Sequence, residues 1–197
     1  MPIERLAAGQ AFHRTVQSAF LTGLAGAVGF PERQWRLLAG GRGRVDLAVE
    51  VEIANALADQ TDYEHRWLIN PQTGQTAFWT ADTGIDGRTP VDLDELDLVG
   101  IDPLPSWVWY QDMADFAGSI TDERAGRRLA RAIQGRGAFR RFKDELHQDH
   151  PDLLSAWYAF RDARAQRRAV QWLADNSLID DEAAELFLAG HSDPDLP

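Results

Sequence analysis

The chain has 197 residues, of which 44% are hydrophobic and 26% are charged, as in ordinary soluble globular proteins. It contains no cysteine, which excludes disulfides, cysteine nucleophiles, thiolate zinc sites and iron–sulfur clusters. The formal net charge is -11, which disfavours non-specific binding to nucleic acid through overall charge.

The positive charge gathers in one part of the chain. Residues 121–170 contain 12 of the 20 lysine and arginine residues and seven acidic residues, whereas the rest of the chain holds eight basic and 24 acidic residues. Lys143 is the only lysine, so almost all of this charge is carried by guanidinium groups, which suit carboxylates, phosphates and aromatic faces. We therefore expect residues 121–170 to carry the distinctive surface of the protein.

Residues 1–43 differ from the rest of the sequence. The run 19–30 consists mainly of small and apolar residues but is too short to cross a membrane. Glu4 precedes the run and few basic residues lie before it, so an amphipathic helix around residues 12–20 fits as well as a signal peptide does. Residues 40–44 read Gly-Gly-Arg-Gly-Arg, which predicts a flexible joint.

A helix and a β-hairpin are expected next. Residues 45–60 alternate at first as in a strand, but Asp46 can cap a helix and the second half has no strand character, so we favour a helix. Aromatic and branched residues at 65–70 and 75–80 flank the sequence Pro-Gln-Thr-Gly. This pattern is typical of two strands joined by a turn.

The segment 81–102 is acidic and rich in loop-forming residues. Its run Asp92–Asp97 lacks the glycine and the ligand spacing of a calcium-binding EF-hand loop, so a solvated face or a partner for the arginines is favoured over a metal site. Helical patterning dominates after this segment. The helices are expected at 106–118, at 122–134, from 138 onward, from Pro151 onward and at 180–189, with residues 191–197 frayed.

Apolar spacing predicts which side chains of these elements are buried. We expect burial of Trp67 and Trp79 on one shared face of the hairpin, of Trp107 and Tyr110 on the first of the later helices, and of Phe139, Phe142 and Leu146 on the third. Gly135 and Gly137 are expected to form the structural turn that ends the 122–134 helix, because glycine readily adopts the left-handed conformation found there.

These elements predict an α+β fold that is mainly helical, with a small antiparallel β-hairpin packed against a C-terminal helical region. We expect a single domain over residues 44–178. The flanking parts are predicted to be an N-terminal extension at 1–43, helical or poorly ordered, and a terminal helix with a frayed tail at 179–197.

Two blocks of the basic segment resemble a known family. The first reads Ala-Ile-Gln-Gly-Arg-Gly-Ala-Phe-Arg-Arg-Phe-Lys-Asp at residues 132–144, and the second reads Trp-Tyr-Ala-Phe-Arg-Asp at residues 157–162. They resemble the bacterial uncharacterised protein family numbered 0158, over roughly residues 45–175. No function or catalytic residue is established for that family, so the resemblance implies no site.

The candidate binding surface is an arginine-rich helical face. Basic residues recur one turn apart on three predicted helices with aromatic residues among them, a pattern that can dock a protein or an anionic partner. The residues proposed for this surface are Arg136, Arg140, Arg141, Lys143, Trp157, Arg161 and Arg164. The alternative is that these arginines neutralise acidic residues of the protein itself or of a second copy.

A second hypothesis places a nucleic acid or a phosphate-bearing ligand at the corner formed by Gly135, Arg136 and Gly137. The helix that follows offers free backbone N–H groups and the positive end of its dipole. The sequence there contains neither a GxGxxG motif nor a P-loop lysine, so the motif itself is a weak signal.

An enzyme is poorly supported. His147 and His150 do not form the HExxH pattern of a zinc site, and no Gly-x-Ser-x-Gly nucleophile motif occurs. We therefore predict no catalytic residue, no metal and no cofactor, and a cytoplasmic binding or adaptor role. A protein partner or self-association is favoured over nucleic acid, and no membrane partner is expected.

Overall fold

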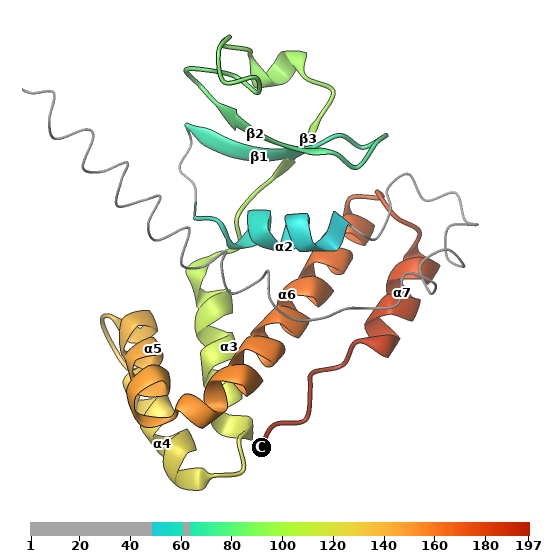
Figure 1. Cartoon of the computed structure of the whole chain (residues 1–197). Coiled ribbons are helices and arrows are strands. Elements are labelled where there is room, and N and C mark those ends of the chain that lie inside the picture. The colour runs from blue at the N-terminus through green and yellow to red at the C-terminus, as the bar shows by residue number, and fades with distance from the viewer. Residues whose placement is uncertain (1–48, 61–63) are drawn as a thin grey trace, which may run out of the picture. The chain divides into compact units, whose positions relative to one another are not determined.

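The computed structural model describes residues 49–60 and 64–197 of the chain (Figure 1). All of the described residues belong to one compact unit. The predictions for residues 1–43, and for Asp46 as a helix cap, therefore lie outside the described residues.

Three antiparallel strands form a small sheet in the order β2-β1-β3. Strands β1 (His65–Ile69) and β2 (Thr76–Thr80) are the predicted hairpin, and β3 (Val99–Ile101) is a third strand that the sequence analysis did not predict. Asn70 sets the hairpin turn, because its side-chain oxygen accepts hydrogen bonds from the backbone N–H groups two and three residues later.

The pairing register places Trp67 and Trp79 on opposite faces of the hairpin, so the prediction that they share a face is wrong. Trp67 lies opposite Phe78, the residue before Trp79. Because side chains alternate between the two faces of a strand, this offset of one residue separates the two indoles. Each indole N–H has its own partner: Trp67 donates to Asp59 and Trp79 donates to the carbonyl of Val91, both at 2.8 Å.

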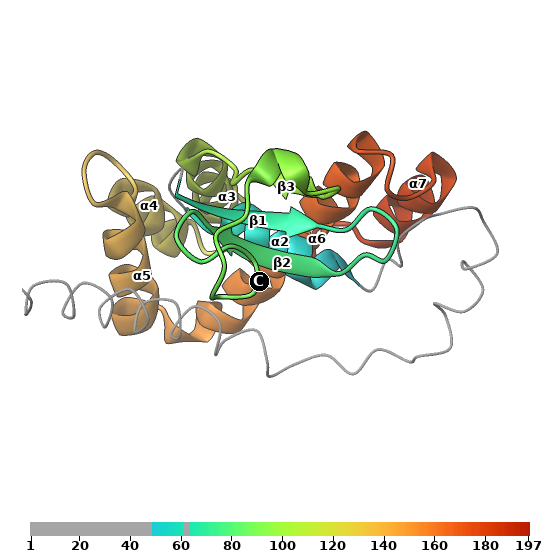
Figure 2. The same cartoon turned by 90° about the horizontal axis from the view of Figure 1, so that it is seen from above.

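Helix α2 (Glu50–Ala58) lies between the sheet and helix α6 (Leu154–Asp175) (Figure 1, Figure 2). Its buried residues recur at helical spacing, which explains why the segment is a helix rather than a strand. They are Ile53, Ala56 and Leu57. The helix predicted in residues 45–60 is confirmed over its described part.

Helical structure dominates the rest of the described chain. The other α-helices are α3 (Ser106–Ser119), α4 (Glu123–Ala132), α5 (Ala138–Asp149) and α7 (Asp181–Gly190), with short 3-10 turns at Leu93–Glu95 and Pro151–Leu153. The helices expected from residue 106 onward are confirmed. With the small sheet they form the mainly helical α+β fold that the sequence predicts.

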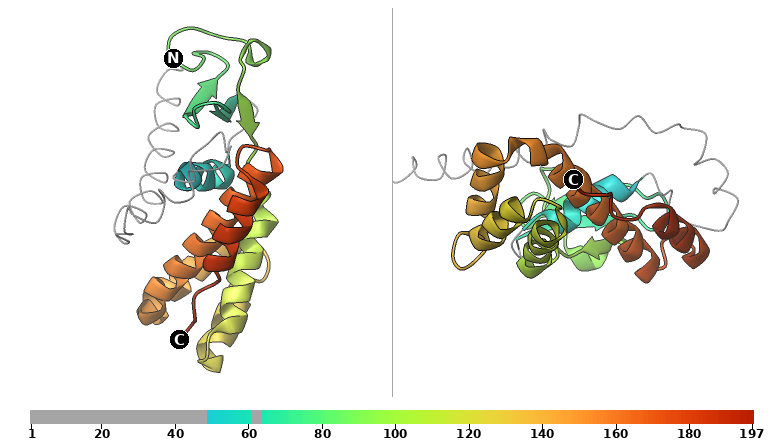
Figure 3. Two further views of the ribbon diagram at one scale, coloured as in Figure 1. Left: turned by 90° about the vertical axis from the view of Figure 1, so that its right-hand side faces the viewer. Right: turned by 90° about the horizontal axis from the view of Figure 1, so that it is seen from below.

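Aromatic side chains join α3, α5 and α6 into one core. The ring of Phe116 lies 6.4 Å from that of Phe142, 5.2 Å from that of Trp157 and 5.6 Å from that of Phe160. The three phenylalanines are buried, and tilted or edge-to-face contacts of this kind add to the free energy gained from their burial. The packing holds α3 and α6 side by side (Figure 3).

The corner between α4 and α5 is determined by local chemistry. At the start of α4, the carboxylate of Asp122 accepts hydrogen bonds from the backbone N–H groups of Arg124 at 2.8 Å and Ala125 at 3.2 Å. At its end, Gly135 and Gly137 have φ angles of 77° and 74°. These left-handed conformations favour glycine and let α5 begin almost at once.

Several aromatic residues predicted to be buried are exposed, so those predictions are wrong. The exposed fractions are 66% for Trp107, 48% for Phe139 and 37% for Tyr110. On α5 the inward stripe begins at Ala138 and continues through Phe142 and Leu146, each four residues apart. Phe139 is rotated about 100° away from that stripe and therefore points outward.

Candidate functional site

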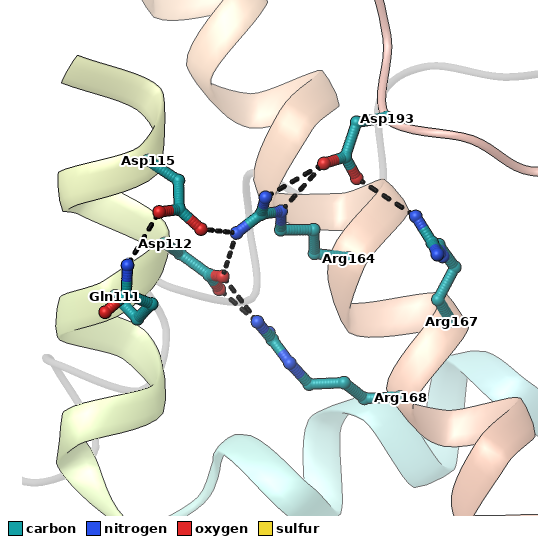
Figure 4. Close-up of polar contacts among 7 residues, drawn as sticks. All are labelled: Gln111, Asp112, Asp115, Arg164, Arg167, Arg168 and Asp193. Atoms are coloured by element: carbon teal, nitrogen blue, oxygen red, sulfur yellow. Dashed lines mark hydrogen bonds and ion pairs between the residues drawn. The ribbon is translucent and has the colours of Figure 1, made fainter. Parts of the chain in front are cut away.

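Arg164 on α6 lies at the centre of a charged cluster between α3, α6 and the segment that follows α7 (Figure 4). Its Nε and Nη2 atoms donate to Asp193 Oδ2 at 3.1 and 2.9 Å. Its Nη1 atom donates to Asp115 and, at 3.2 Å, to Asp112 Oδ1. The guanidinium carbon also lies 4.4 Å from the ring centroid of Phe160. The charge of Arg164 is therefore neutralised inside the protein rather than presented to a partner.

Arg168, one turn further along α6, holds Asp112 with two N–H groups. Its Nη1 atom donates to Asp112 Oδ2 at 2.8 Å and its Nη2 atom to Oδ1, while its guanidinium lies 5.2 Å from the ring of Trp109. Asp112 is 1% exposed, the only buried charged side chain among the described residues. A buried carboxylate needs such partners, because an unpaired charge in the interior is strongly destabilising.

Hydrogen bonding keeps this cluster charged. Burial would lower the pKa of Arg164, but hydrogen bonds to Asp193, Asp115 and Asp112 outweigh burial and hold that pKa above its usual range. Burial would likewise raise the pKa of Asp115, but hydrogen bonds from Arg164 and Gln111 hold it below its usual value of 3.8. Both shifts favour the ion pair at neutral pH.

Trp157 and Arg161 are also used within the fold. The ring of Trp157 lies 4.9 Å from that of Phe142, as part of the aromatic core. Arg161 donates from Nε and Nη2 to Asp162 Oδ1 at 2.9 and 2.7 Å, and its guanidinium lies over the ring of Tyr158 at 5.0 Å. Neither side chain forms part of an open aromatic and basic surface.

Arg141 closes the end of α4. Its Nε atom donates to the carbonyl of Ala132 at 2.9 Å, and its two terminal nitrogens donate to the carbonyls of Gln134 and Arg136. The last carbonyl groups of a helix have no partner within the helix, and a cation near them also opposes the helix dipole. Arg141 therefore shapes the corner that the glycines permit.

An open groove of about 450 Å³ runs between α4 and α5. Arg128 pairs there with Glu145 and, at 3.1 Å, with Asp149, and the hydrogen bond to Glu145 raises the pKa of Arg128. His150 Nε2 lies 3.6 Å from the same Glu145 carboxylate. The groove walls carry both signs of charge, and Arg131 adds an exposed cation.

The exposed face of α5 carries the remaining predicted cations. Arg140 is 88% exposed in its side chain and forms only a 3.6 Å ion pair with Asp144. Phe139 and Lys143 are exposed one turn apart on α5, next to Arg140, and the exposed Arg136 lies in the turn just before the helix. We call Arg136, Phe139, Arg140 and Lys143 the α5 face.

The structure thus separates the seven predicted site residues into two groups. Arg141, Trp157, Arg161 and Arg164 are engaged by the fold, whereas Arg136, Arg140 and Lys143 are each exposed, the first in the turn before α5 and the other two on α5. The cluster around Arg164 also uses Arg168, Asp112 and Asp193, which the sequence analysis did not include. Helical spacing from Arg164 could have suggested Arg168, but no local signal connects Asp193 with α6.

The family model described as Uncharacterised protein family (UPF0158) matches residues 51–191. The chain belongs to this family. A UPF0158 protein of Pseudomonas aeruginosa is 36% identical over 81 residues, which cover 41% of this chain and 52% of the relative. The chain therefore spans about half the length of the curated relative it matches. No solved structure matches the chain significantly.

The UPF0158 match confirms the resemblance drawn from the two sequence blocks, and it includes both charged features of the structure. Asp112, Arg164 and the α5 face lie within it, whereas Asp193 lies beyond its end. In the described part of this UPF0158 chain, no three histidine or acidic side chains are placed to hold a metal ion. None of the described helices has the length and apolar content needed to span a membrane.

Proposed function

We propose that this UPF0158 protein is a binding or adaptor protein that docks an acidic protein partner on the α5 face. The observation that carries the proposal is the exposure of Phe139 between cations that the described fold leaves to solvent. The aromatic ring provides apolar contact area, and Arg136, Arg140 and Lys143 provide charge around it. Aromatic and arginine side chains dominate the binding energy of protein interfaces, and surrounding charges raise association rates.

A protein partner fits the neighbourhood of this face better than a nucleic acid does. Asp144 lies beside Arg140, and the groove behind it contains the carboxylates of Glu145 and Asp149. A phosphate backbone would meet these carboxylates as well as the cations, whereas a protein surface can match both signs. Electrostatic complementarity of this kind gives specificity.

The second candidate is a nucleic acid or phosphate ligand at the Gly135–Gly137 corner. One observation favours it: α5 begins at Ala138 with no side-chain cap, so no capping side chain occupies its first N–H groups. Against it, Arg141 is turned to the carbonyls at the end of α4, so only Arg136 and Arg140 remain to hold the anion. The cytoplasmic location remains a prediction.

A photo-crosslinking amino acid in place of Phe139 tests the proposal in cells. We expect one discrete crosslinked product that is sensitive to protease and insensitive to nuclease. The matched control replaces Leu186, which is 56% exposed on α7, and should not give this product. Arg136→Glu combined with Lys143→Glu should abolish the product, because two of the three cations of the face become acidic.

Four outcomes count against an acidic protein partner. A product that disappears with nuclease assigns the face to the second candidate. No product at position 139, or the same product at position 186, leaves the face without a specific partner. A product that survives the double charge reversal shows that the cations do not recognise the partner.

A further inference from the structure

Residues 191–197 lie against α3 and α6 although they form neither helix nor strand (Figure 3). Three contacts fix the segment. Asp193 accepts hydrogen bonds from Arg164 and, at 3.4 Å, from Arg167. Leu196 packs on the buried apolar cluster of the helices, and the carbonyl of Pro197 accepts a hydrogen bond from the backbone N–H of Thr121 at 2.7 Å. A segment expected to fray is instead anchored at three points.

The surface that receives the segment is also held by contacts that do not include the segment. Asp112 and Asp115 orient the guanidinium of Arg164 from α3, and the ring of Phe160 lies beneath the guanidinium. These contacts leave the Nε and Nη2 edge of Arg164 directed at Asp193. A planar guanidinium held in this way suits a carboxylate, so the surface already has the geometry to bind one.

Charge balance indicates what the surface lacks without the segment. Arg164, Arg167 and Arg168 face the carboxylates of Asp112, Asp115 and Asp193 (Figure 4). Removal of Asp193 leaves three arginines with two carboxylates, and removal of Leu196 uncovers part of the apolar cluster. The surface then presents one unbalanced cation beside an apolar patch. A short extended peptide with one acidic and one apolar side chain would match this cation and this apolar patch.

We propose that this α3–α6 surface binds a partner protein through an extended peptide with an aspartate three residues before a leucine, and that residues 191–197 compete for the same place. The segment contains that spacing in Asp193 and Leu196, and Pro194 between them favours an extended backbone. The surface lies within the UPF0158 match, which ends at residue 191, whereas the competing segment lies beyond it. The proposal is independent of the α5 face.

Competition within one chain is strong, so a partner must overcome it. A segment joined by a short linker competes as if it were present at roughly millimolar concentration. A partner peptide therefore binds measurably only when its own affinity is high or when the segment has been weakened. This requirement makes the segment an inhibitor of the site.

The test uses the full chain and a fluorescent peptide with the sequence of residues 191–197. The variant Asp193→Ala/Leu196→Ala weakens the internal segment, and we expect it to bind the peptide at least about tenfold more tightly than the wild-type chain does. A peptide with alanine at the aspartate and leucine positions should not bind. The matched control Glu185→Ala/Leu186→Ala removes an acid and a leucine from the exposed side of α7 and should behave as the wild type does.

A second measurement covers the case in which the double variant does not fold. In the wild-type chain with isotope-labelled leucine methyl groups, unlabelled peptide in excess of the roughly millimolar effective concentration of the segment should move the Leu196 signals towards their values in an unstructured peptide. Equal peptide binding by the variant and the wild type, or Leu196 signals that do not move, would overturn the proposal. A wild-type dimer that exchanges residues 191–197 would also overturn it, because the partner would then be a second copy.

Discussion

Asp112 on α3 and Arg168 on α6 form a two-point ion pair, with Oδ2 and Nη1 2.8 Å apart, at the one buried charge of the described chain. This ion pair joins α3 to α6 in addition to the contacts between their aromatic side chains. We predict that Asp112→Ala lowers the free energy of unfolding by about 3 kcal/mol, because Arg168 and part of Arg164 lose their partner in a partly buried position. Urea denaturation of the two proteins measures the difference.

Two controls make this prediction specific. Asp144→Ala removes a carboxylate from an exposed pair with Arg140, so the free energy of unfolding should change by less than about 0.5 kcal/mol. The double variant Asp112→Leu/Arg168→Leu should recover much of the stability lost in Asp112→Ala, because no unpaired charge remains. A double variant no more stable than Asp112→Ala would contradict the unpaired charge as the cause.

Arg140 and Arg141 are adjacent but should respond differently to substitution. Arg141→Ala is expected to lower the free energy of unfolding by about 1 to 2 kcal/mol, because the last carbonyl of α4 and two carbonyls of the turn that follows lose a charged donor. Arg140→Ala is the control and should change it by less than about 0.5 kcal/mol. Thermal denaturation followed by circular dichroism compares the two, and equal losses would show that Arg141 has no special role.

The features that the sequence predicts well depend on neighbours in the chain. Asp122 caps α4 through N–H groups two and three residues later, and the glycines at 135 and 137 turn the chain where they occur. The hairpin turn around Asn70 has the same local origin. Each of these turns and caps depends only on residues within a few positions of it, so the helices and the hairpin could be predicted from the sequence.

The features that the sequence does not predict depend on which face of an element packs and on distant partners. Phe139 is exposed because the inward stripe of α5 begins at Ala138, and spacing alone cannot choose between two adjacent starting residues. Arg164 meets Asp112 across 52 residues and Asp193 across 29. The sequence alone is compatible with arginines that face a partner and with arginines that face the protein's own acidic residues. For Arg164 the structure shows the second alternative, which no local pattern could decide.

Gly126 and Gly118 provide opposite tests of the packing between α3 and α4. A Cβ atom at Gly126 would lie 2.6 Å from the carbonyl oxygen of Ala117, a backbone atom that cannot move away easily. Gly126→Ala should therefore lower the free energy of unfolding by about 2 kcal/mol. Gly118 lies in α3 with open space around it, so Gly118→Ala should raise the free energy by about 0.5 to 1 kcal/mol. Urea denaturation distinguishes the two, and a Gly126→Ala variant as stable as the wild type would show that the helices can separate.

Asp115 should make the stability of the protein depend on pH in the acid range. Its pKa in the folded protein lies below the usual value of 3.8, so the ionised form is favoured by folding. The stabilisation is therefore complete above the unfolded-state pKa of about 3.9, and it is lost as the pH falls through the lower folded-state pKa. We expect the free energy of unfolding to decrease as the pH is lowered below about 4.

Asp115→Asn isolates this contribution. The groups that hydrogen-bond to Asp115 are Arg164 and Gln111, and neither changes its protonation between pH 2 and 7, so the carboxylate is the group that titrates in this contact. The variant should be less stable than the wild type at pH 7, and the difference should shrink as the pH falls below about 4, because protons then bind Asp115 more tightly in the unfolded chain than in the folded one. The pKa of Asp122 is lowered too, by hydrogen bonds from the backbone of Ala125 and Arg124, so part of the pH dependence should remain in the variant. A difference that stays constant from pH 7 to pH 2.5 would show that Asp115 contributes through packing rather than through its charge.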